Sequence, residues 1–131
     1  MELVRGIHTL SPSNTERVTA EAADQQAAIH FIRGDHVVDR DSFFDAVRAT
    51  LPLFPPVFSR DNWDALSDSI WNGLNELNTT RVLIIWSDSH HMKESPEDFE
   101  MALNVLEDVI EGLASPQATV GKPKEVTVLL A

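Results

Sequence analysis

Three aspartates in residues 60–71 are spaced so that a helix would bring them to one face. Asp61, Asp64 and Asp68 are followed by Trp71, and the successive spacings are 3, 4 and 3 residues. At about 100° per residue, these four side chains share one sector of a helix. The apolar residues of the segment fall in a roughly opposite sector: Trp63, Leu66, Ile70, Leu74 and Leu77. The pattern predicts a helix over residues 60–77 with one face for the core and another that presents carboxylates and an indole.

The carboxylates of this row suit a cationic partner. Like charges on one helix face repel each other by roughly 0.2–0.5 kcal/mol per pair, and Arg60 is the only basic residue in residues 60–77. Carboxylates can take the place of phosphates opposite Arg and Lys side chains, and Trp is enriched at binding hot spots. A solvated helix face with Trp71 folded into the core is the simpler alternative. A catalytic acid pair is disfavoured, because such pairs line clefts rather than convex helix faces.

A second polar cluster follows an apolar segment of the chain. Asp88, His90 and His91, with Glu94 nearby, could bind zinc or another divalent ion. Adjacent side chains point apart in an extended chain and lie about 100° apart on a helix, so the two histidines are poorly placed to share one ion. We interpret the segment as a polar loop and expect no cofactor. A metal-dependent hydrolase that uses these three residues stays an alternative.

The composition is that of an acidic globular protein. The chain has 131 residues, is 43% hydrophobic and carries a formal net charge of −11, so it fits one domain and would repel nucleic-acid phosphates. An acidic protein attracts cationic partners such as proteins that bind RNA or DNA, although solubility alone could explain the charge. The chain has no cysteine, no apolar stretch near the roughly 20 residues of a membrane span and no signal-like N-terminus. We therefore expect a cytoplasmic location with no membrane partner and no direct nucleic-acid binding.

Strands and helices alternate along the predicted chain. Apolar runs predict strands at residues 27–32, 81–86 and 125–130, the first as a buried strand and the second as a central parallel strand. Helices are predicted over residues 42–51, where Asp41 could be the cap, and over residues 96–111, ending near Gly112. This alternation favours an α/β fold in which a small parallel sheet of three strands packs with helices. Residues 5–10 could supply a fourth strand, and residues 15–25 a surface helix.

Residues 58–68 resemble the motif of the barstar family, the intracellular inhibitors of barnase-type ribonucleases. The family pattern is an aromatic residue, a short loop and then Asn-x-Asp-Ala-Leu-x-Asp. Here Phe58 follows a Pro-rich turn and precedes Asn62-Trp63-Asp64-Ala65-Leu66-Ser67-Asp68. The order of predicted strands and helices is similar as well. The resemblance implies a barstar-like domain over residues 27–131, with residues 1–26 as a strand–helix extension packed on the same domain.

The resemblance also implies that the protein is not an enzyme. It would be an inhibitor or immunity protein, as in toxin–antitoxin pairs, that blocks the cationic active site of a basic ribonuclease. Asp68 would enter the phosphate-binding site of that enzyme, Asp64 would sit beside it, and Phe58 would pack near the catalytic histidine. Asn62 fits a role at the start of the helix, and Asp108 would meet cations at the rim.

The sequence departs from the family pattern at three positions. Phe58 replaces a usual Tyr, Arg60 stands where Gly is usual, and Ser67 replaces a large aromatic that often contacts the enzyme. Trp71, one turn later, could compensate for Ser67, so both are included among the expected partner-binding residues. These differences leave the inhibitory mode in place and leave open which ribonuclease is the target. A barstar-like fold used for another protein partner stays an alternative.

Overall fold

A four-stranded parallel sheet forms the centre of the computed structural model, which describes residues 4–131. Its strands are β1 (Gly6–Thr9), β2 (Ala28–Arg33), β3 (Arg81–Ser87) and β4 (Glu125–Leu130). The strand order is β1-β4-β3-β2, and each neighbouring pair is parallel. The predicted α/β class with three parallel strands and a fourth from the N-terminal segment is confirmed.

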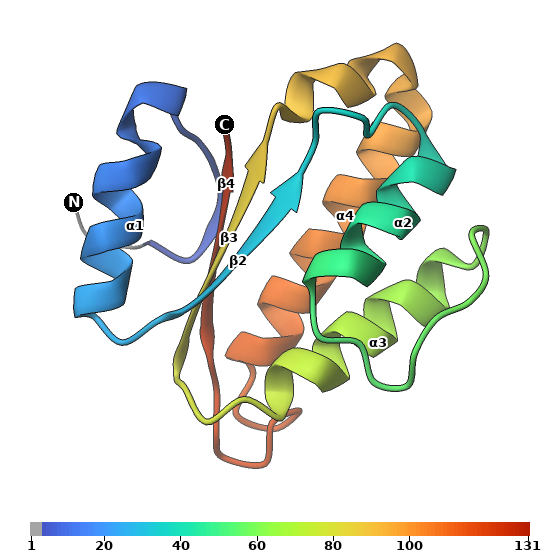
Figure 1. Ribbon diagram of the computed structural model, residues 1–131. Helices are drawn as coiled ribbons and strands as arrows, with labels where there is room; N and C mark the ends of the chain where they lie inside the picture. Colours follow the sequence, from blue (N-terminus) through green and yellow to red (C-terminus); the bar gives the residue numbers. More distant parts are fainter. Residues whose placement is uncertain (1–3) are drawn as a thin grey trace.

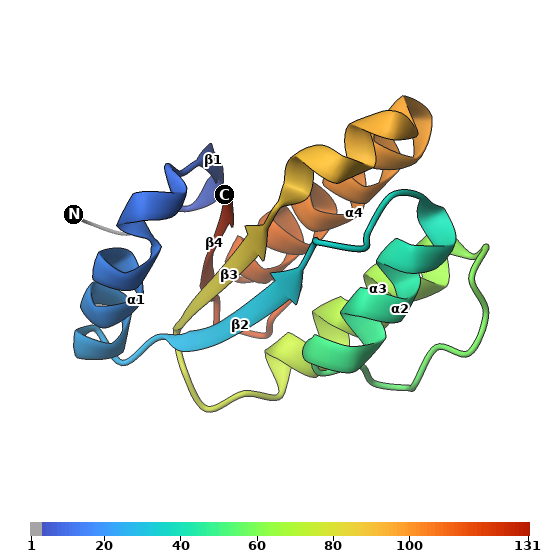
Figure 2. The same cartoon turned by 45° about the horizontal axis from the view of Figure 1, so that its top comes forward.

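Helices cover both faces of this sheet. The α-helices within residues 4–131 are α1 (Thr15–Asp24), α2 (Arg40–Thr50), α3 (Trp63–Asn75) and α4 (Pro96–Ala114). Short 3-10 helices, η1 (Pro12–Asn14) and η2 (Ser89–Glu94), precede α1 and α4. Figures 1 and 2 show α1 on one face and α2, α3 and α4 on the other. Helix α4 runs past Gly112, where it was predicted to end, because Leu113 is still fully buried in the core. None of the helices in residues 4–131 is long and apolar enough to cross a membrane.

The continuous apolar run of β3 is explained by helices on both of its sides. Leu83 and Ile85 pack towards α1, in a cluster with Val18 and Ala22. The alternate residues Val82, Ile84 and Trp86 belong to the larger core beneath α2, α3 and α4. Each residue of both sets is at most 1% exposed. β3 is therefore the central strand that its composition predicted.

β2 differs from its prediction, because it lies at an edge of the sheet and pairs there with β3. Ile32 is fully buried on the side of the larger core, whereas Phe31 is 39% exposed. The predicted strand is present, but the expectation that it is buried throughout is wrong.

The N-terminal segment completes the sheet at its other edge. β1 pairs with β4 from Gly6↔Thr127 to Thr9↔Leu130, and the Leu10 N–H donates to the carbonyl of Leu130 at 2.8 Å. Helix α1 then covers the second sheet face through Val18 and Ala22, which are fully buried. The division of the chain at residue 26 stays a prediction.

Helix α2 is capped by Asp39, and the prediction that Asp41 caps it is wrong. The Asp39 carboxylate accepts hydrogen bonds from the Ser42 N–H at 2.9 Å and from the Ser42 hydroxyl at 2.6 Å. The Ser42 hydroxyl oxygen also accepts from the Asp39 N–H, which completes a capping box. These hydrogen bonds lower the pKa of the Asp39 carboxyl below its usual value. The helix begins two residues earlier than predicted, so Asp41 lies in its first turn.

Asp39→Ala should therefore lower the free energy of unfolding by about 1 kcal/mol at neutral pH. Because the carboxyl pKa is lower in the folded state, the carboxylate stabilises the fold fully above its unfolded pKa. This contribution is lost as the pH falls through the folded value. Urea denaturation at neutral pH and at a pH of about 3 should show the gap between variant and wild type shrinking at the lower pH.

Asp41→Ala is the matched control and should change stability by less than about 0.5 kcal/mol. An equal loss from both variants would contradict the assignment of the cap to Asp39.

Candidate protein-binding site

Helix α3 begins at Trp63, later than the predicted start at residue 60. Asn62 is its N-cap, and its side-chain oxygen accepts a hydrogen bond from the Ala65 N–H at 3.0 Å. The structural role expected of Asn62 at the helix start is present. Arg60 and Asp61 precede the helix, so the prediction that Asp61 belongs to the acidic helix face is wrong.

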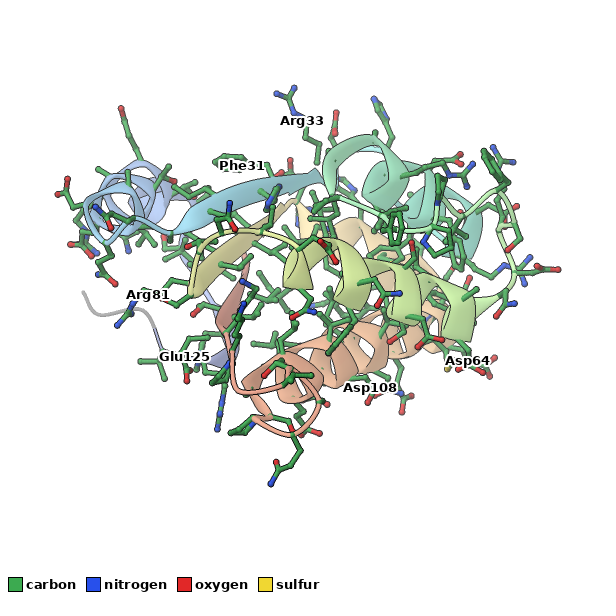
Figure 3. The ribbon with its side chains drawn as sticks, turned by 90° about the horizontal axis from the view of Figure 1, so that it is seen from below. Phe31, Arg33, Asp64, Arg81, Asp108 and Glu125 are labelled. Atoms are coloured by element: carbon green, nitrogen blue, oxygen red, sulfur yellow. The ribbon has the colours of Figure 1, made fainter. Side chains whose placement is uncertain are left out.

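Asp64 and Asp68 lie one turn apart on α3, and both are exposed. The helix contains no lysine or arginine, and neither carboxylate forms an ion pair within the described part of the chain. Figure 3 shows Asp64 at the outer end of the helix, away from the sheet. Two uncompensated negative charges therefore face solvent side by side.

The loop of residues 51–62 is fixed against α3 by its backbone. The Phe54 N–H donates to the Ser69 carbonyl at 3.1 Å, and the Ser69 hydroxyl donates to the Pro55 carbonyl. The Pro52 carbonyl passes so close to the helix that a Cβ on Gly73 would lie 1.9 Å from its oxygen. Sequence reasoning missed Ser69 and Gly73; their signal was a small residue on each of two successive turns of an otherwise large apolar face.

An ion pair holds the end of this loop against α2. The Arg60 guanidinium donates to both carboxylate oxygens of Asp45, at 3.1 and 2.9 Å. Arg48 lies 3.6 Å from the same carboxylate and donates to the Ser59 carbonyl at 3.4 Å. Since Arg60 is bound to Asp45, its charge is compensated there rather than by Asp64 or Asp68. Sequence reasoning missed Asp45 and Arg48.

A hollow of about 470 Å³ lies where the outer part of the loop meets α3. Asp68 lines it from the helix, and Phe58, which is 83% exposed, lines it from the loop. The remaining lining residues are Pro55, Pro56, Val57, Ser59, Ala65, Ser69 and Asn72. The site therefore combines an apolar wall with one carboxylate and can receive a flat or aliphatic group that carries a positive charge.

Trp71 is not the exposed indole that the spacing predicted. Its side chain is only partly exposed and packs against the larger core. Its ring lies over α4, since a Cβ on Gly112 would be 2.7 Å from the indole nitrogen. Ser67 is also partly buried. The simpler alternative, in which Trp71 folds into the core, describes this residue better than a free binding residue does.

Asp108 is exposed on α4, the helix that packs beside α3. Figure 3 labels Asp108 and Asp64 along the same margin of the molecule. Asp108 does not line the hollow. The structure thus brings Phe58 and Asp68 together, places Asp64 one turn away and leaves Asp108 on the neighbouring helix.

The histidines of η2 do not form a metal site with Asp88. The rings of His90 and His91 are tilted by 32° to each other, with their centroids 4.3 Å apart. No group of three or more His, Cys, Asp or Glu side chains in residues 4–131 is placed to hold a metal ion. The arrangement gives no support to the alternative of a metal-dependent hydrolase.

The fold and this site define a small parallel α/β protein with a convex acidic helix beside an apolar loop. The family model described as Barstar (barnase inhibitor) matches residues 27–128, which is more than half of the chain. The chain belongs to the barstar family. No curated protein and no solved structure matches it.

Gly73→Ala tests how tightly the loop is seated on α3. Replacing Gly by Ala inside a helix normally gains about 1 kcal/mol. Here the added methyl would meet the Pro52 backbone, so we expect a loss of about 1–3 kcal/mol in the free energy of unfolding. Urea denaturation measures the sign directly. Asn75→Ala, on the same helix, should stay within about 0.5 kcal/mol, and a stabilised Gly73→Ala variant would show that the loop does not rest on the helix.

Proposed function

We propose that this protein inhibits a basic ribonuclease by inserting Asp68 into the enzyme's phosphate-binding site. Membership of the barstar family supports the class of partner. The observation that carries the proposal for this site is the Asp68 carboxylate, which is exposed and forms no ion pair within residues 4–131, and which lines the same hollow as Phe58. A carboxylate in that position can replace an RNA phosphate opposite Arg and Lys side chains.

The other site residues would support this contact in different ways. Asp64 would meet a second cation of the enzyme, and Phe58 would cover the group that enters the hollow. Asp108, with Ser67 and Trp71, would lie towards the rim, where contacts contribute less to affinity. Asn62 would act indirectly, by fixing the first turn of α3.

The mode of action would be steric and electrostatic. A folded domain with its helix in the substrate cleft excludes RNA, so the protein itself carries out no chemistry. We place the inhibitor in the cytoplasm, where it would act as an immunity protein or antitoxin against a ribonuclease toxin or against a ribonuclease that the cell secretes.

Asp68→Ala should weaken inhibition at least about thirtyfold, because a central charged hot spot commonly contributes about 2 kcal/mol or more. The measurement is cleavage of a fluorescent RNA oligonucleotide by barnase, and by ribonucleases captured from the source cell's secretome, with increasing inhibitor. Asp24→Ala is the matched control, since Asp24 is an exposed acid on α1, across the sheet. Equal inhibition by wild type and Asp68→Ala would overturn the proposal.

Association should depend on salt. The protein, with its net charge of −11, and a cationic partner attract each other over long distances. Salt screens this attraction, since the Debye length falls from about 10 Å at 0.1 M to about 3 Å at 1 M. We expect the association rate constant to fall roughly tenfold or more over this range, with a smaller change in the dissociation rate. Stopped-flow fluorescence measures both. An association rate that does not change with salt would exclude charge steering.

A further inference from the structure

The loop beside α3 carries a second exposed ring that the motif does not include. Phe54 is 63% exposed and Phe58 is 83% exposed, and only Pro55, Pro56 and Val57 separate them. Val57 is buried, while both prolines are exposed. We call Phe54, Pro55, Pro56 and Phe58 the loop patch. Exposed apolar groups that gather in this way are typical of interaction sites.

The loop patch has a fixed place on the molecule. The N–H of Phe54 and the carbonyl of Pro55 are both bound to Ser69 of α3, and the Asp45–Arg60 ion pair holds the other end of the loop. Figure 1 shows the loop bowing outward beside α2 and α3. Because the backbone of this loop is already fixed, binding does not have to order the loop, which lowers the entropic cost of a contact made there.

The charges around the loop patch indicate what could cover it. Asp68 shares the hollow with Phe58, Pro55 and Pro56, and Asp64 is exposed one turn away. The one basic residue at the end of the loop, Arg60, is bound to Asp45. A complementary surface therefore has cations next to an apolar area.

A cleft that binds unpaired RNA has this combination. Such clefts hold phosphates with cations and stack bases on flat apolar surfaces beside them. Two carboxylates and two exposed rings on the inhibitor would occupy both kinds of subsite.

We propose that Phe54 is a contact residue that packs on the base-stacking surface of the ribonuclease while Asp68 occupies its phosphate site. The inference rests on the proposed function and adds a contact outside the residues of the family motif. Phe54 would then contribute to the choice of target, because its contact depends on the surface beside the phosphate site and not on the phosphate site itself.

Phe54→Ala should weaken binding to the inhibited ribonuclease roughly tenfold to a hundredfold. The slope of log affinity against log salt should stay that of wild type, because no charge is removed, whereas Asp68→Ala should reduce the slope. Phe54→Tyr keeps the ring and should bind as wild type. Affinity is measured by calorimetry with barnase or the captured ribonuclease, and the thermal midpoint of each variant is measured alongside.

Phe31→Ala is the matched control, because Phe31 is an exposed Phe on β2, where it faces α1. Figure 3 shows it at the edge of the molecule far from Asp64. This variant should bind as wild type. If Phe54→Ala also binds as wild type while Asp68→Ala is weakened, the Phe54 contact is overturned and the proposed function stands. If wild type inhibits none of the ribonucleases, both are overturned.

Discussion

The arrangement of the proposed binding face depends on one backbone contact, the approach of the 51–62 loop to α3. Gly73 leaves room for the Pro52 carbonyl, and Ser69 binds the backbone of the next residues in the loop. The same helix carries Asp64 and Asp68 and buries Leu66, Ile70 and Leu74 in the core. The rings of the loop and the carboxylates of the helix are therefore held by one rigid element. Their relative positions do not depend on long, flexible side chains.

The sequence predicts those features that short-range periodicity determines. β3 and α4 were predicted at nearly their observed positions. A buried strand and an amphipathic helix can each be recognised from the order of apolar and polar residues within the segment itself. The exposure of Asp64 and Asp68 follows in the same way, since Leu66 and Ile70 fix which side of the helix is buried. The resemblance to the family pattern predicts that this side of the helix binds a partner.

Features that depend on distant neighbours could not be predicted. An apolar run of residues can form either an edge strand or a central strand. Nothing in residues 27–32 therefore indicated that β2 has a neighbouring strand on one side only. The burial of Trp71 requires Gly112 of α4 to lie opposite. The pairing of Arg60 with Asp45 depends on how the loop folds back over α2. Helix α3 begins at Trp63, where Asn62 caps its first turn, and not at residue 60.

The position of β4 in the sheet governs the order in which the protein can assemble. β4 lies between β3 and β1, although of the strands described in residues 4–131 β1 is synthesised first and β4 last. On the ribosome, β1 has no strand to pair with until residues 125–130 have emerged, because its neighbour in the sheet is β4. The face of the sheet beneath α1 is incomplete for the same period. Completion of this sheet is therefore a late event in the life of the nascent chain, because β1 waits for the strand that lies farthest from it in the sequence.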